Sequence, residues 1–208
     1  MQRVWGRATS VNVMKLVWLL ELLKIPYERI DVGGSFAGIE TAAYRAMNPN
    51  GKIPTLEQED GFVLWESNAT LRYLASTSAG GEAYWPAEAR QRANIDRWMD
   101  WQQTTIDAPQ RVLLRGLVRT RPQDRDVSAN ELAADELRRA WSILDEELAK
   151  HPFVAGENFS LADIALGAHV HRWFAYEIEK PALPSLRSWY EHLLTLAIYR
   201  QHVALPVK

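Results

Sequence analysis

The sequence contains no cysteine in its 208 residues. This absence excludes disulfide bonds, thiolate zinc sites and any cysteine nucleophile supplied by the chain itself. A thiol that takes part in chemistry on this protein must therefore belong to a ligand.

Excess charge and long apolar runs are also missing. The chain has 24 basic against 26 acidic residues, a net charge of −2, so nucleic acid or an anionic membrane held by bulk charge is not an expected partner. No segment approaches the roughly 18 consecutive apolar residues that would span a membrane. The stretch with Arg3 and Arg7, which leads into the polar Thr9 and Ser10, does not fit a signal peptide. We expect a cytoplasmic protein.

The first 80 residues mix strand-like alternation with helical periods. A hairpin that turns at Asp60-Gly61 is the clearest strand signal, and Val13 begins an apolar stripe of helical spacing that ends before Pro26. These patterns predict the order β-α-β-α-β-β-α. The predicted elements are strands at 3–5 and 27–32, helices from 13, at 38–47 and at 67–76, and the hairpin at 54–66.

Beyond the glycine-rich stretch "AGGEAYWP", strand patterns stop and long helical periods follow. We expect an α+β protein with a mixed domain at 1–80, a linker at 81–86 and an all-α domain at 87–208. The helical periods cover 87–119, with a break at Pro109, and 128–150, 160–176 and 184–200.

The segment "NPNGKIPTL" (48–56) places Pro54 in a strand-like run, where a proline removes a ladder donor. With a cis Ile53–Pro54 peptide, the backbone N–H and C=O of Ile53 would point outward and could pair with an extended peptide ligand. The alternative is an ordinary turn proline, because few X–Pro bonds are cis.

The segment "WESNA" (65–69) lies between a strand and a helix. Ser67 either caps this helix or, with the free first-turn N–H groups, holds a ligand carboxylate, and Glu66 would then meet a ligand ammonium. Further along, Ser160 and Asp163 form a capping-box pattern, which we assign to structure and not to chemistry.

The segment "GRATSVNVMK" (6–15) offers Thr9, Ser10 and Asn12 at one helix start. A single cap would suffice, and no acidic residue stands three positions after any of them, so no capping box is formed. Capping alone explains this pattern poorly. A helix N-terminus that holds an anion explains it better.

Together, these motifs resemble the soluble glutathione S-transferase superfamily over essentially the whole chain. "NPNGKIPTL", "WESNATLRYL" and "SLADIALG" follow one another in the family's order and spacing. The resemblance implies a thioredoxin-like N-terminal domain, an all-helical C-terminal domain, glutathione as co-substrate, no metal and a homodimer.

The same resemblance implies roles for individual residues. Ile53, beside Pro54, would pair with the cysteinyl unit of glutathione, Glu66 and Ser67 would bind the γ-glutamyl end, and Lys52 would lie near the glycyl carboxylate. An arginine of the basic run 115–126, or Arg111, would reach the glutathione of a partner subunit.

The sulfur would lie at the start of the first helix. The first tyrosine, Tyr27, comes too late to serve there, and "SVNVMK" resembles the bacterial Ser/Thr-x-Asn pattern of theta-like and nu-like members. The resemblance implies Ser10 as the donor to the thiolate, with Asn12 assisting and Thr9 as the alternative. Lowering a thiol pKa by about two units takes roughly 2.7 kcal/mol. One hydrogen bond to a charged group contributes about 1.5–3 kcal/mol, so this bond and a helix N-terminus together suffice.

Three functions remain open on the sequence. The first is attack of the glutathione thiolate on a small electrophile that binds between the domains. The second, suggested by the nu-like pattern, is glutathione-dependent disulfide or peroxide reduction. The third is a non-enzymatic binding module with this fold. His169 and His171 are not expected to hold a metal, because residues two apart do not share a helix face.

Overall fold

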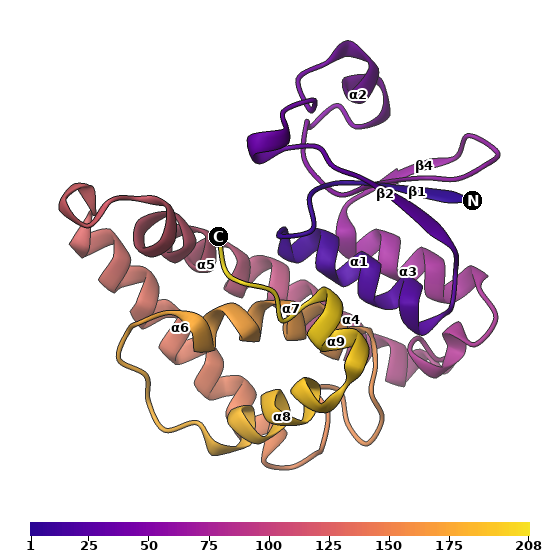
Figure 1. Cartoon of the computed structure of the whole chain (residues 1–208). Helices are drawn as coiled ribbons and strands as arrows, with labels where there is room; N and C mark the ends of the chain where they lie inside the picture. Colours follow the sequence, from indigo (N-terminus) through magenta and orange to yellow (C-terminus); the bar gives the residue numbers. More distant parts are fainter.

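The computed structural model describes residues 1–208, and Figure 1 shows a small sheet and its helices packed against a larger helical part. The sheet has the strand order β2-β1-β3-β4, with β1 parallel to β2 and antiparallel to β3, and β4 antiparallel to β3. The α+β fold class and the predicted element order are confirmed. The elements are β1 (Gln2–Trp5), α1 (Val11–Leu22), β2 (Tyr27–Ile30), η1 (Gly34–Phe36), α2 (Ala42–Met47), β3 (Thr55–Glu57), β4 (Val63–Trp65) and α3 (Ser67–Thr77).

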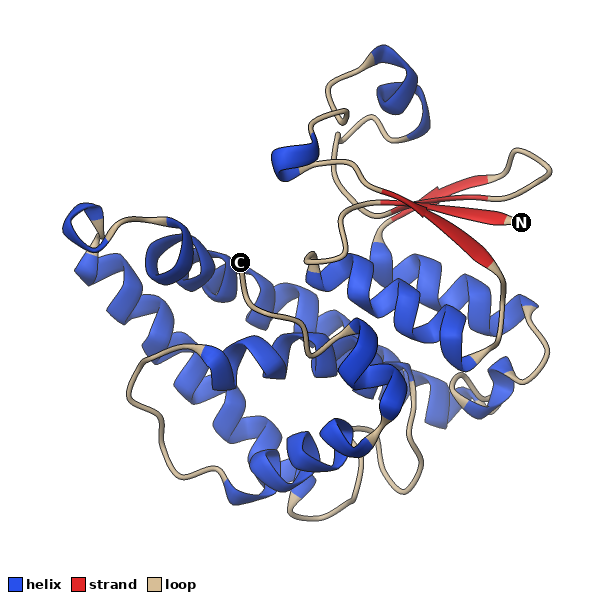
Figure 2. Ribbon diagram, viewed as in Figure 1, coloured by secondary structure: helices blue, strands red, loops and turns tan.

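The rest of the chain is helical, as Figure 2 shows by the absence of strands there. No helix is both long and apolar enough to cross a membrane. The elements are η2 (Gly81–Ala83), α4 (Ala89–Trp101), η3 (Gln102–Ile106), α5 (Asp107–Leu113), η4 (Leu114–Arg119), η5 (Pro122–Asp124), α6 (Val127–Leu148), α7 (Leu161–Ala175), α8 (Pro184–Thr195) and α9 (Ala197–His202).

The expected break at Pro109 is wrong, because helical structure continues from α4 to η4 through this proline. The segments η3 and η4 are π-helical, and η3 ends just before the turn of α5 that contains Pro109. The wider π turn changes the hydrogen-bond register and thereby accommodates a residue that has no N–H to donate.

Two other predicted helices also differ in extent. The short helix expected at 38–47 begins only at Ala42, where the Thr41 hydroxyl accepts from the Tyr44 N–H at 3.2 Å; the preceding Gly38 has a φ of 88°. The helix expected at 184–200 divides into α8 and α9 at Leu196, whose backbone is extended. Local caps and backbone conformation override the apolar period at these points.

The capping box at the start of α7 is confirmed. The Ser160 hydroxyl accepts from the Ala162 N–H at 3.3 Å, and the Asp163 carboxylate accepts from the Ser160 N–H at 2.9 Å. The same carboxylate also accepts from the Val154 N–H and from the Trp189 indole, each at 3.0 Å. This buried residue therefore ties α7 to the loop before it and to α8.

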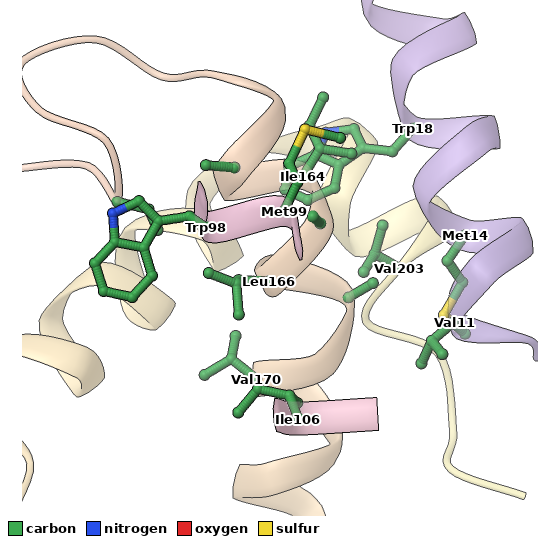
Figure 3. Close-up of a cluster of buried hydrophobic side chains, with 14 of the residues drawn as sticks. Val11, Met14, Trp18, Trp98, Met99, Ile106, Ile164, Leu166, Val170 and Val203 are labelled. Atoms are coloured by element: carbon green, nitrogen blue, oxygen red, sulfur yellow. The ribbon is translucent and has the colours of Figure 1, made fainter. Parts of the chain in front are cut away.

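One continuous apolar core joins the sheet part to the helical part. Helix α1 lies at its centre, and Figure 3 shows Val11, Met14 and Trp18 pointing from α1 toward side chains of α7 and of the C-terminal segment. Trp18 is fully buried and packs on Phe159 and Tyr199, with ring centroids 5.5 and 5.0 Å away. Helix α1 is thus held from both sides, which fixes the position of its N-terminal end.

Candidate active site

A cavity of about 260 Å³ lies where the N-terminal ends of α1 and α3 meet the loop before β3 and the α4–α5 helix. Its wall is almost entirely polar and combines cations with carboxylates. The lining residues are Asn12, Lys15, Asn48, Lys52, Ile53, Pro54, Glu66, Ser67, Gln102, Gln103, Asp107 and Arg111.

Six of the eight residues predicted from the sequence line this one cavity. They are Asn12, Lys52, Ile53, Pro54, Glu66 and Ser67. Thr9 and Ser10 are not among the lining residues and lie in the turn that leads into α1. The structure therefore brings together the predicted groups from three separate motifs.

Ser10 stands at the N-cap position of α1, but its hydroxyl makes no capping hydrogen bond. The helix begins instead through the Ser10 carbonyl oxygen, which accepts from the Met14 N–H at 2.8 Å. Ser10 is 8% exposed, and its hydroxyl has no hydrogen-bond partner in the chain. This leaves the hydroxyl and the first N–H groups of α1 available to an acceptor from outside the helix.

A hydrogen bond joins the beginning of α1 to the beginning of α3. The Ser67 hydroxyl donates to the Asn12 side-chain oxygen at 3.2 Å. Ser67 is the first residue of α3 and not its cap, because Glu66 holds the N-cap position; the sequence-based capping role for Ser67 is wrong. Two helix N-termini, each with unpaired N–H groups, therefore face the same cavity.

Glu66 has an unusual backbone conformation, with φ 70° and ψ 105°. A residue other than glycine held at positive φ costs on the order of 1–3 kcal/mol and is concentrated at binding sites. The carboxylate is exposed, makes no capping bond and forms no ion pair. The surrounding structure therefore holds this acid at the cavity without using it for stability.

The loop before β3 presents backbone groups to the cavity. The Ile53–Pro54 peptide is cis, as the sequence suggested, and neither the N–H nor the C=O of Ile53 has a hydrogen-bond partner in the chain. The loop is fixed through the preceding carbonyl, that of Lys52, which accepts from the Tyr44 hydroxyl at 2.7 Å and from the Asn48 amide at 2.9 Å. Ile53 therefore offers one free donor and one free acceptor, the set that pairs with an extended peptide.

Lys15, which sequence reasoning did not single out, is 1% exposed and forms part of the cavity wall. Its ammonium donates to the side-chain oxygens of Asn68 at 3.0 Å and Gln102 at 2.9 Å. Burial lowers the pKa of Lys15 to about 7, partly offset by the carboxylates of Asp107 and Glu66. One signal was available: Lys15 is the only charged residue within the apolar run 13–20 of α1, and a buried charge is costly.

The α4–α5 helix contributes Asp107 and Arg111, paired at 3.3 Å. Arg111 was expected to reach a partner subunit, and the structure places it at the cavity of its own chain. Neither position carries a local sequence signal, because their place at the cavity depends on how the helical part packs on α1. Cations and carboxylates around one cavity suit a ligand that itself bears both charges.

Family models match both parts of the chain. The glutathione S-transferase N-terminal domain matches residues 9–77, and the glutathione S-transferase C-terminal domain matches residues 103–192. The glutathione S-transferase GstB of Escherichia coli K12 is 38% identical over 205 residues, which cover 98% of each chain. The chain belongs to the glutathione S-transferase family.

The solved structures agree with this assignment. A theta class glutathione S-transferase from Xanthomonas axonopodis pv. citri, with glutathione bound, aligns with a TM-score of 0.95 at 40% identity and covers 100% of this chain and 99% of its own. A disulfide-bond oxidoreductase of E. coli, YfcG, is 28% identical over 192 residues, 89% of this chain and 87% of its own. This glutathione S-transferase is thus similar to relatives named for two different reactions.

Proposed function

We propose that this transferase binds glutathione in the polar cavity and activates its thiol for attack on a small electrophile. The observation that carries the proposal is the hydrogen bond between Ser67 and Asn12, which places the N-termini of α3 and α1 at one cavity. One helix start suits the carboxylate of the γ-glutamyl unit, and the other suits the thiolate.

The lining residues match the remaining groups of the tripeptide. The γ-glutamyl ammonium meets Glu66, whose carboxylate has no partner in the chain, and the cysteinyl backbone pairs with the free N–H and C=O of Ile53. The exposed Lys52 receives the glycyl carboxylate. Each charged or hydrogen-bonding group of the tripeptide named here thus has a complementary group on the cavity wall.

The thiolate is assigned to the Ser10 hydroxyl, with the Asn12 amide assisting. Asn12 uses its oxygen toward Ser67, which leaves its amide nitrogen to donate into the cavity. No general base is required, because a hydrogen bond to the thiolate contributes about 1.5–3 kcal/mol and a helix N-terminus adds about 0.3–1 kcal/mol.

Calorimetric titration with reduced glutathione, followed by turnover of a neutral electrophile, tests this function. We expect saturable binding that Ser67→Ala weakens about tenfold, the cost of roughly 1.4 kcal/mol. Ser185→Ala, on α8, is the matched control and should bind as wild type does. Failure of the wild-type protein to bind reduced glutathione would refute the proposal.

A second function is favoured by the resemblance to YfcG and by the Ser/Thr-x-Asn pattern. In this reaction a bound glutathione thiolate would attack a disulfide, and a second glutathione would complete the reduction, because the chain has no cysteine of its own. The same titration separates the two functions. Tighter binding of oxidised than of reduced glutathione, together with disulfide reduction, would favour this alternative.

We also propose that the protein is a homodimer. Large apolar side chains remain exposed on two surfaces: Leu132 and Ile143 on α6, and Phe62 and Trp65 on the β3–β4 hairpin. A second copy that covers them would remove this area from water. Light scattering should give twice the mass of one chain, and the mass of a single chain would contradict the proposal.

A further inference from the structure

Three arginines meet beside the turn that carries Ser10. Arg7 lies in the loop before α1, Arg119 ends the long α4–η4 helix, and Arg172 lies on α7. Arg172 is only 6% exposed, and its guanidinium donates to the Thr9 carbonyl oxygen at 2.8 Å. A buried cation therefore stands directly behind the backbone of the proposed thiol site.

None of these three guanidinium groups pairs with the side chain of an aspartate or glutamate. Several arginines elsewhere in the chain do pair with acids. Arg72 reaches Asp96 at 2.6 Å and Asp100 at 2.7 Å, and Arg138 reaches two acids of its own helix at 2.6 Å each. Other arginines, such as Arg45 and Arg92, also lack an acidic partner and donate to main-chain oxygens. The cluster beside Ser10 differs from them because three such guanidinium groups lie together.

The three charges also repel one another. Burial, with contributions from Arg119 and Arg7, lowers the pKa of Arg172 to about 10, and Tyr176 and Asp107 offset only part of this. Burial and the charge of Arg119 likewise lower the pKa of Arg7. Guanidinium groups carry a positive charge in proteins, so a bound anion would relieve the repulsion within the cluster.

The cluster lies beside the residues of the proposed thiol site. A Cβ placed on Gly33 would lie 3.5 Å from Ile53 Cδ1 and 3.6 Å from Arg7 Nη1, so the Arg7 guanidinium lies close to the residue assigned to the cysteinyl unit. Arg172 approaches from the helical part through Thr9. An electrophile that reaches the thiolate from between the two parts would therefore meet positive charge on both sides.

Arg119 already holds an oxygen in the structure. It donates to the main-chain oxygen of Lys208 at 3.0 Å, at the end of the tail that follows α9 and runs toward the end of α5 (Figure 1). An oxygen acceptor at this position is thus compatible with the geometry of the exposed Arg119 side chain.

We propose that the electrophile carries a carboxylate, and that Arg7, Arg119 and Arg172 hold this charge beside the thiolate. The inference rests on the proposed glutathione transfer. The sulfur forms a bond to the carbon that bears the leaving group, the leaving group departs with its bonding electron pair, and the thiol proton passes to solvent. Guanidinium groups suit this task because their planar donors match a carboxylate and because they offset its repulsion from the thiolate.

Iodoacetate and iodoacetamide provide the test, because they share a leaving group and differ in charge. The absence of cysteine from the chain keeps these probes from alkylating a protein thiol. We expect wild-type kcat/KM to be higher for iodoacetate than for iodoacetamide. Arg7→Met and Arg119→Met should each lower kcat/KM for iodoacetate about tenfold or more and leave iodoacetamide little changed.

Arg121→Met is the matched control, since this arginine is 76% exposed and pairs with Asp124 at 2.7 Å; it should leave both rates unchanged. If kcat/KM fell equally for both substrates in the Arg7 and Arg119 variants, the arginines would act only on the thiolate. This result would overturn the inference. Turnover of iodoacetamide without any preference for iodoacetate would also overturn it while the proposed function stands. Turnover of neither substrate would count against the proposed function and this inference together.

Discussion

At the residue scale, charged groups at the cavity are held in conformations that cost stability. Glu66 has a positive φ and no partner, and Lys15 is buried within an otherwise apolar helix face. Neither is explained by packing. Such costs are tolerated where a ligand uses the group, which supports the assignment of this cavity as the binding site.

Lys15 gives a prediction about stability and pH. Its folded pKa of about 7 lies below the value of about 10.4 in an unfolded chain, so the unfolded state binds an extra proton between these values. The free energy of unfolding should therefore rise with pH from about 7 to 10, by up to about 1.4 kcal/mol per pH unit. Below pH 7 this contribution becomes constant, because both states are protonated.

Urea unfolding at a series of pH values measures this slope. Lys15→Met should abolish the contribution, while Lys150→Met, at a lysine whose side chain is 63% exposed, should leave the slope as in wild type. The same slope in Lys15→Met as in wild type would show that Lys15 does not titrate in this range.

At the scale of elements, sequence patterns placed most helices and strands because each has its own period and its own caps. The capping box of α7 and the turn at Asp60-Gly61 are local signals, and both agree with the structure. The division at Leu196 and the passage of the helix through Pro109 depend instead on packing and on π turns, which no short motif announces.

The α7 capping box yields a prediction about stability. Asp163→Asn replaces a carboxylate oxygen by an amide donor where the Ser160, Val154 and Trp189 donors all point. We expect a loss of about 2–4 kcal/mol, since each donor left unpaired in the core costs about 1–3 kcal/mol. Thermal unfolding measures the loss.

Asp126→Asn is the matched control for this change. Asp126 caps α6 by accepting from the Ala129 N–H at 2.9 Å, and asparagine caps helices equally well. Its stability should therefore stay near that of wild type. An equal loss of stability in both variants would mean that the buried hydrogen bonds of Asp163 contribute no more than an ordinary helix cap.

At the scale of the whole molecule, the cavity exists only because two parts of the chain pack together. The motif residues of the sheet part could be assigned from local sequence, but Gln102, Asp107 and Arg111 reach the cavity only once the helical part lies on α1. Their place is a tertiary property, and the sequence gives no spacing that links them to Glu66. Lys15 is the exception, because it is the only charged residue in the apolar run 13–20 of α1.

The shared core predicts that both parts unfold together. In Gly167→Ala the new methyl group would lie 2.8 Å from the Trp18 ring, which forces α7 and α1 apart and should cost about 1–3 kcal/mol. Helix content and glutathione binding should be lost in a single unfolding transition. The midpoint of this transition should be lower in the variant than in wild type. Two separate transitions, with binding retained after the first, would contradict a single cooperative unit.

The most direct test of the account is the pKa of the glutathione thiol in the bound state, followed by the ultraviolet absorbance of the thiolate as pH is raised. A free thiol has a pKa near 8.5. We predict that the pKa of the bound thiol is about two units lower. Ser10→Ala should raise it by about one to two units, the loss of one hydrogen bond to a charged group, while Thr9→Val should not. A bound thiol that titrates as a free one does, or one that responds to Thr9 and not to Ser10, would contradict the assignment of Ser10 at the start of α1 as the thiolate donor.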